Sequence, residues 1–235
     1  MKVPKRRRRW LSADIDRIMN EIYYIIMTIT DTYFQDKTDK REFIHSCTTE
    51  IFEKIEALSE ALLVLWNVNR YEEKKMNSWK EQIEKEMSLL NRMNAQKIDP
   101  PVIMKLDWET VHKMEFLGNM CELHRYTHGK VANANMKYDD TQGALLIRLV
   151  NDALFETVSA NYIFPETRKD YLKRRQHISK AITLLYAMNR PMLSYINLMH
   201  YSERILYEWG EMLEKEILLL KGLQRADGER FRHLK

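Results

Sequence analysis

The chain has 235 residues and a net charge of +4, and with 45% hydrophobic and 31% charged residues it has the composition of a folded globular protein. Six glycines and five prolines are too few for the many tight turns of a β-sandwich or β-barrel. Two cysteines cannot form a disulfide framework, and no apolar run approaches the roughly 20 residues of a membrane span, so we expect a cytoplasmic protein without membrane contact.

The chain begins with a basic tail. Residues 1–9 carry six basic side chains and no acidic one, so the remainder of the chain is slightly acidic. A solvated basic tail attracts phosphate without needing a fold of its own. The sequence therefore predicts nucleic-acid contacts from Arg6, Arg7, Arg8 and Arg9.

Helical periodicity dominates the first half of the chain. We expect a first helix from Ser12 to about Phe34, followed by a polar break. Apolar residues spaced by three and four predict a second helix carrying Phe43 to Leu65 and a third carrying Met76 to Met93. The third helix ends at Asp99, because the two prolines that follow disfavour helical backbone.

The second half has the same character. The pattern predicts a fourth helix at about 106–127, a polar linker at 129–143 and a fifth helix at about 144–161. A sixth helix opens at Pro165, and a seventh runs from about Pro191 to Leu223. No segment alternates with period two for long enough to indicate a strand.

An internal repeat relates the two halves. Trp79–Leu90 and Trp209–Leu220 are identical at seven of twelve positions, and both include Glu-Lys-Glu in the same place. Repetition of this kind indicates two similar structural units. We therefore expect an all-α protein of about seven helices, arranged as two similar up-down helical-bundle units in tandem.

The domain boundaries follow from these elements. They are a basic tail at 1–9, a first bundle unit at 10–98, a bridging helix and linker at 99–143, a second unit at 144–224 and a basic C-terminal tail at 225–235.

Residues 144–223 resemble a family of small four-helix bundles. The resemblance is carried by Ala153-Leu154-Phe155, by Phe164-Pro165-Glu166-Thr167-Arg168 at the start of a helix, by the stripe from Ile178 to Leu185, and by Trp209 with Met212-Leu213. The family includes the accessory variability protein (Avd) of diversity-generating retroelements and the proteins encoded in intervening sequences of 23S ribosomal RNA. The first repeat departs from the pattern, with Tyr33-Phe34-Gln35 in place of Phe-Pro.

The resemblance implies a function. It implies a non-catalytic protein without a cofactor that binds RNA or RNA/DNA as an accessory subunit of a reverse-transcriptase ribonucleoprotein. It also makes self-association of the bundles possible. A helical protein–protein adaptor with one acidic and one basic face is the alternative, and a metal-binding helical enzyme is a second one.

The helix that opens at Pro165 is the candidate nucleic-acid surface. Seven basic and two acidic residues lie between Glu166 and Arg190, whereas the helix carrying Phe43 to Leu65 is strongly acidic. Several accessible cations on one helix can neutralise several phosphates. The predicted contacts are Arg168, Lys169, Lys173, Arg174, Arg175 and Lys180.

The metal alternative depends on two patterns. Glu42 with His45, and Glu109 with His112, have the Glu-x-x-His spacing of di-iron bundles. Cys121, His124 and His128 share one helical face and could supply three zinc ligands. The chain contains no phosphate-binding loop, no nucleophile elbow and no dinucleotide fingerprint, so we expect no enzymatic activity.

Overall fold

A computed structural model describes residues 41–68, most of 77–88, 104, 106–133 and 141–234. In these ranges the protein is all-α, as predicted, and the described residues contain no strand. The elements are α2 (Arg41–Val68), α4 (Trp108–Lys113), α5 (Glu115–Asn133), α6 (Thr141–Tyr162), α7 (Arg168–Leu198), α8 (Glu203–Arg230) and the short 3₁₀ helix η2 (Arg232–Leu234).

The chain divides into two compact units, with the boundary between Lys105 and Leu106. In the N-terminal unit, α2 buries the predicted stripe of aliphatic residues, which includes Ile51, Ile55 and Leu58. The main-chain N–H of Met104 donates a hydrogen bond to the buried Ser59 hydroxyl at 3.0 Å. Residues 77–81, 83–85 and 87–88 are helical, and Trp79 is buried within this unit. The predicted first helix and the basic tail lie outside the described residues.

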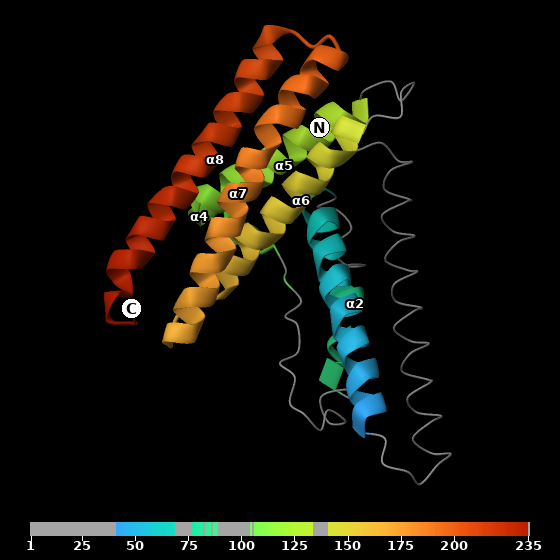
Figure 1. Cartoon of the computed structure of the whole chain (residues 1–235), viewed down its shortest axis with the longest axis vertical. Coiled ribbons are helices and arrows are strands. Elements are labelled where there is room, and N and C mark those ends of the chain that lie inside the picture. Colours follow the sequence, from blue (N-terminus) through green and yellow to red (C-terminus); the bar gives the residue numbers. More distant parts are fainter. Residues whose placement is uncertain are drawn as a thin grey trace. The chain divides into compact units, whose positions relative to one another are not determined.

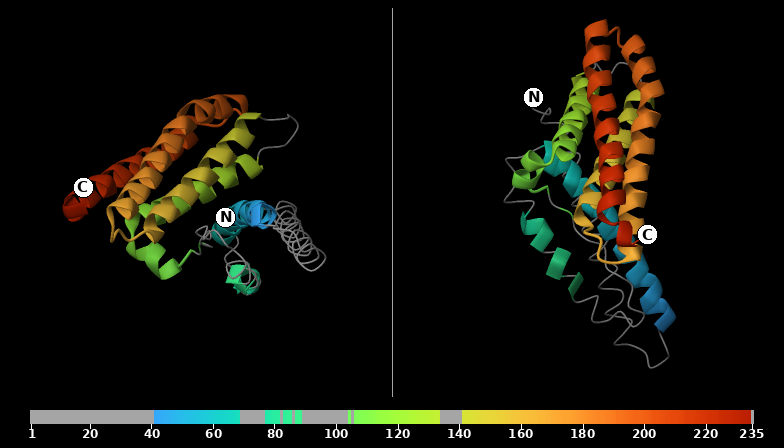
Figure 2. Two further views of the ribbon diagram at one scale, coloured as in Figure 1. Left: turned by 60° about the horizontal axis from the view of Figure 1, so that its bottom comes forward. Right: turned by 90° about the vertical axis from the view of Figure 1, so that its left-hand side faces the viewer.

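The C-terminal unit is a four-helix bundle of α5, α6, α7 and α8, which run alongside one another (Figure 1). Around the bundle, α5 contacts α6, α6 contacts α7, α7 contacts α8, and α8 returns to α5 (Figure 2). We expected residues 99–143 to bridge two bundles, but α5 is one of the four helices of this bundle. The bundle therefore begins at least one helix earlier than the repeat pattern predicts.

The core of the bundle follows the helical spacing of the sequence. On α7, four members of the predicted stripe, Ile178, Ala181, Leu185 and Met188, are completely buried, whereas the fifth, Ile182, is half-buried. Trp209 of α8 is also completely buried, and its Nε1–H donates to the Thr127 hydroxyl of α5 at 3.0 Å. This burial of one apolar stripe per helix is what holds four amphipathic helices together.

The long helix α7 passes through Pro191 without ending. We predicted that a new helix begins at about Pro191, but α7 continues through this residue to Leu198. Proline lacks the N–H that would bond to the carbonyl of Ala187, and a helix interior normally avoids this loss. Pro191 is buried in the bundle, so the packing of its ring offsets the lost hydrogen bond.

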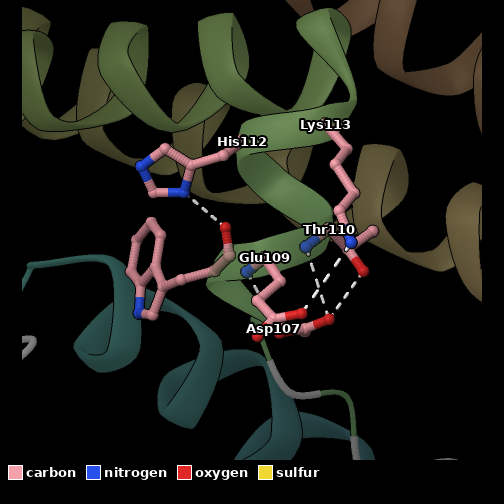
Figure 3. A network of polar contacts seen from close by, with 6 residues as sticks. Asp107, Glu109, Thr110, His112 and Lys113 are labelled. Atoms are coloured by element: carbon pink, nitrogen blue, oxygen red, sulfur yellow. Dashed lines mark hydrogen bonds and ion pairs between the residues drawn. The ribbon is translucent and has the colours of Figure 1, made fainter.

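A well-formed cap begins the C-terminal unit at α4. The Asp107 carboxylate accepts hydrogen bonds from the main-chain N–H of Glu109 at 3.2 Å and of Thr110 at 3.3 Å (Figure 3). It also accepts one from the Thr110 hydroxyl at 2.6 Å, and this bond is the main reason that the pKa of Asp107 is lowered. Such a cap satisfies N–H groups that have no partner within the helix. The predicted single helix at 106–127 is therefore two helices, which meet at Met114.

Candidate nucleic-acid interface

Five of the six basic residues predicted on α7 are exposed to solvent. The capping box of Thr167 and Asp170 starts the helix, and it sets the direction of the first basic side chains. The buried stripe described above occupies one side of α7, so charged residues spaced between its members lie on the other side. The exposed residues are Arg168, Lys169, Lys173, Arg175 and Lys180.

The prediction that Arg174 contacts nucleic acid is wrong. Its side chain is buried, and its guanidinium donates from Nε to Asp227 of α8 at 2.5 Å and from Nη2 to the same carboxylate at 3.4 Å. Its Nη1 donates to the carbonyls of Ala160 at 2.6 Å and Ile163 at 3.0 Å. A guanidinium that is buried and occupied in this way cannot contact phosphate, so Arg174 is a structural residue that ties α7 to α8 and to the end of α6.

Lys180 is exposed but partly neutralised. Its ammonium lies 3.4 Å from the Glu156 carboxylate of α6, and the half-buried His177 contacts the same carboxylate at 2.5 Å. An exposed ion pair of this kind is weak, so the Lys180 cation remains accessible to a stronger anion. Lys180 nevertheless contributes less net positive charge to the surface than its neighbours do.

The predicted C-terminal tail is in fact folded onto the bundle. Helix α8 extends to Arg230, and Phe231 is buried against Phe164 at a ring distance of 5.9 Å and against Tyr171 at 6.4 Å. Because Asp227 and Phe231 are anchored, the arginines between and beside them are fixed on the same end of the bundle as the start of α7. Arg225, Arg230 and Arg232 are exposed there.

Seven exposed cations therefore lie together where α7 begins and α8 ends. In the same two segments the exposed carboxylates are Glu166 and Glu229, while Asp170 serves the cap and Asp227 is buried with Arg174. Within the described chain, none of the seven cations takes part in an ion pair. We call this surface the basic end, and it consists of Arg168, Lys169, Lys173, Arg175, Arg225, Arg230 and Arg232.

Sequence reasoning missed the three arginines of α8 and its extension because it assigned them to a tail. The sequence did contain a pattern that predicts a longer helix. Asp227 follows the buried Leu220 by seven residues and Phe231 follows Asp227 by four, so both continue its buried face. The remaining predicted contacts, Arg6 to Arg9, lie outside the described residues.

The predicted zinc ligands form a buried polar cluster of a different kind. The Nε2 atoms of His124 and His128 lie 3.0 Å and 2.8 Å from Oδ1 of Asn151 on α6, so Asn151 accepts a hydrogen bond from each ring. Burial, together with the neighbouring His128, holds the pKa of His124 well below its usual value, so the ring is neutral. Cys121 is buried one turn away and forms no disulfide.

The Glu-x-x-His pairs do not form a metal centre in the part of the chain that is described. His112 Nδ1 is bonded to the carbonyl of Trp108, and Glu109 is exposed beside Lys113 (Figure 3). The side chains of Glu42 and His45 lie outside the described residues. Among the described residues, no group of three or more acidic, histidine or cysteine side chains is placed to hold a metal ion.

Two findings concern the chain as a whole. No helix among the described residues is long and apolar enough to cross a membrane. The chain matches no known family model, and neither curated proteins nor solved structures give a significant match. The basic end is therefore the feature of the described chain with the clearest chemical character.

Proposed function

We propose that this protein binds RNA or RNA/DNA through the basic end of its C-terminal bundle. The observation that carries the proposal is that the start of α7 and the end of α8 expose seven cations but only two carboxylates, Glu166 and Glu229. Phosphate contacts from Lys and Arg supply most of the sequence-independent affinity for nucleic acids. Each phosphate of a single strand that the protein neutralises makes the negative slope of log affinity against log salt steeper by about 0.7.

We further propose that the protein is a non-catalytic accessory subunit of a reverse-transcriptase ribonucleoprotein in the cytoplasm. This part rests on the sequence resemblance, and the four helices α5–α8 agree with the architecture that the resemblance implies. Neither cysteine forms a disulfide, which suits a reducing compartment. In this setting the reverse transcriptase is the protein partner, and the bundles are available to self-associate.

Charge reversal at the basic end tests nucleic-acid binding. The variant Lys169→Glu/Lys173→Glu/Arg225→Glu changes three exposed side chains that have no part in the core. We expect it to fold normally, to lose binding to an RNA oligonucleotide at physiological salt, and to show a flatter salt dependence. Binding is measured by fluorescence anisotropy over a series of salt concentrations.

A matched control reverses three other exposed cations of the same unit. Lys113, Arg148 and Arg204 each pair with an acidic residue four positions away on their own helix. Changing these three to Glu gives the same net charge as the test variant but leaves the basic end intact. Equal loss of binding in both variants would show a nonspecific charge effect and would contradict the proposed site.

The adaptor function has one observation in its favour. On α2, Glu50, Glu53 and Glu56 are exposed on one side of the helix, and they form an acidic surface on the N-terminal unit. If the wild-type protein binds no RNA at any salt concentration, this acidic surface and the basic end become protein-binding sites. Capture of the reverse transcriptase without RNA would then support the adaptor function.

A further inference from the structure

Phe164 is the most exposed large hydrophobic side chain of the described residues, with 72% of its surface accessible. It lies in the connection between α6 and α7, directly before the basic residues that begin α7. We propose that Phe164 stacks on an unpaired base, so that the basic end binds single-stranded nucleic acid in preference to a duplex. This inference rests on the proposed nucleic-acid-binding function and names the class of nucleic acid.

The main chain on both sides of Phe164 is fixed. Arg174 donates hydrogen bonds to the carbonyls of Ala160 and Ile163, which are the last anchored groups before the phenylalanine. Pro165 is buried immediately after it. The Phe164 ring is thus exposed on a segment whose main chain is already fixed. Binding a ligand there therefore costs less conformational entropy than binding to a flexible loop would.

Among the described residues, Phe231 is the aromatic neighbour of the Phe164 ring, and this contact leaves most of the ring accessible. Phe164 and Phe231 are 5.9 Å apart at an interplanar angle of 86°, which is an edge-to-face contact. This arrangement fixes the tilt of the ring without stacking another side chain flat on it. Phe231 itself is buried, with the guanidinium of Arg230 at 5.9 Å from its ring centre.

The surroundings of Phe164 indicate a nucleic acid as the ligand. Arg168 and Lys169 are exposed four and five residues after the phenylalanine, and Arg230 and Arg232 adjoin in sequence the Phe231 whose ring it contacts. An aromatic ring beside several exposed cations is the arrangement that single-strand binders use. The base stacks on the ring while the adjoining phosphates reach the cations.

The preference for a single strand follows from how the bases are stacked in each ligand. In a duplex every base is already stacked on its neighbours, and inserting a side chain requires unstacking. In a single strand the bases are free to stack on an aromatic ring, and each such contact is sequence-tolerant. Phe164 therefore adds affinity for the single strand only, and the cations add affinity for both.

The experiment compares three oligonucleotides of about twelve nucleotides, which fits the span of known single-strand sites. They are a single strand, the same sequence as a duplex, and an abasic strand that keeps the phosphates. The full-length protein is compared with Phe164→Ala, with Phe164→Tyr, which retains an aromatic ring, and with Tyr207→Ala. Tyr207 is a matched control, because it is 67% exposed on α8 and lies far along the helix from the basic end.

We expect Phe164→Ala to weaken binding of the single strand about tenfold, and to leave duplex and abasic binding unchanged. Phe164→Tyr and Tyr207→Ala should bind all three ligands as the wild type does. An unchanged affinity of Phe164→Ala for the single strand, or an equal loss for all three ligands, would overturn the inference. Thermal unfolding of Phe164→Ala checks that the contact with Phe231 is not needed for folding.

Failure of the inference and failure of the proposed function give different results. If the wild type binds none of the three oligonucleotides, the proposed function fails and the inference fails with it. If the wild type binds the duplex and the abasic strand as well as the single strand, and Phe164→Ala has no effect, only the inference fails. In that case the basic end binds phosphate alone.

Discussion

At the scale of single residues, Glu216 is a carboxyl group in the core of the bundle. Its side chain is completely buried on α8, and its Oε2 accepts a hydrogen bond from Asn119 of α5 at 2.9 Å. Among the described residues, its Oε1 has no hydrogen-bond partner. Burial raises the pKa of Glu216 from 4.5 to about 8, against the opposing effect of the Asn119 hydrogen bond. The carboxyl is therefore mostly protonated at neutral pH.

This burial predicts a pH dependence of folding stability. Between pH 4.5 and about pH 8, folded Glu216 holds a proton that the unfolded chain releases. Stability should therefore fall as the pH rises through this window, by at most about 1.4 kcal/mol per pH unit. Glu216→Gln should remove this dependence, whereas Glu214→Gln, at an exposed neighbour, should keep it. Urea unfolding at several pH values is the measurement, and identical pH profiles for Glu216→Gln and wild type would contradict the prediction.

The Arg174–Asp227 pair predicts a large loss on truncation. Arg174→Ala leaves the Asp227 charge buried without its partner, so we expect a loss of about 3–5 kcal/mol in unfolding free energy. Replacing both residues with Met and Leu should recover much of this loss. Arg175→Ala changes an exposed neighbour and should alter stability by less than about 0.5 kcal/mol. A loss for Arg175→Ala as large as that for Arg174→Ala would show that the burial of Arg174 does not matter.

At the scale of elements, helix type and buried faces could be predicted well from the sequence. The spacing of apolar residues located α6 to within three residues at its start and identified the buried stripe of α7. It was less informative where a charged residue occupies a position of the stripe. Arg174 precedes Ile178 by four residues and Ala181 by seven, so periodicity alone places it in the core, but its charge suggested the surface.

Element boundaries were harder to predict, because tertiary packing decides them. Pro191 is normally a helix breaker, yet it lies inside α7 because its ring is buried in the bundle. The C-terminal arginines belong to an ordered end because Phe231 packs on Phe164, a contact between residues 67 positions apart that no local pattern contains. The basic end as a cluster therefore could not be predicted without the structure, whereas the exposure of the individual α7 lysines could be predicted from the sequence.

The repeated tryptophans predict similar losses in the two units. Trp209 is 0% and Trp79 is 8% exposed, and each lies on a helix of a different unit. Trp→Ala at either position should cost about 3–5 kcal/mol, because a large aromatic surface is lost and a cavity remains. Chemical unfolding is the measurement, with the half-buried Trp108→Ala as a milder comparison. A loss below about 1 kcal/mol at Trp79 would show that the repeat does not conserve the role of this residue.

At the scale of the whole molecule, the division at Leu106 predicts that the C-terminal unit folds by itself. Residues 106–235 contain all four helices of the bundle and the contacts that close it around α5 and α8. A chain with its own closed core should unfold cooperatively. We expect the fragment to be helical by circular dichroism and to show one sigmoidal urea transition. A molten fragment without such a transition would show that the bundle requires residues 4–105.

The basic N-terminal tail predicts a change in salt dependence. Deleting residues 1–9 removes six positive charges that lie outside the described residues. Phosphate contacts position a nucleic acid and carry little sequence information, so the deletion should weaken binding to different RNA sequences alike. The slope of log affinity against log salt should become flatter. An unchanged slope would show that Arg6, Arg7, Arg8 and Arg9 do not contact RNA.

The polar contacts inside the bundle have a consequence for how the helices are aligned. Aliphatic side chains can exchange neighbours when one helix slides by a turn along another, and little free energy changes. The groups of a buried hydrogen bond or ion pair cannot exchange partners in this way. If one helix slides, these groups lose their partners in a protein interior that does not solvate them. Each such contact therefore selects a single register for the two helices that it joins, and together they link every neighbouring pair of the bundle. These contacts are Asn119–Glu216 and Thr127–Trp209 between α5 and α8, His124–Asn151 and His128–Asn151 between α5 and α6, Arg174–Ala160 between α6 and α7, and Arg174–Asp227 between α7 and α8.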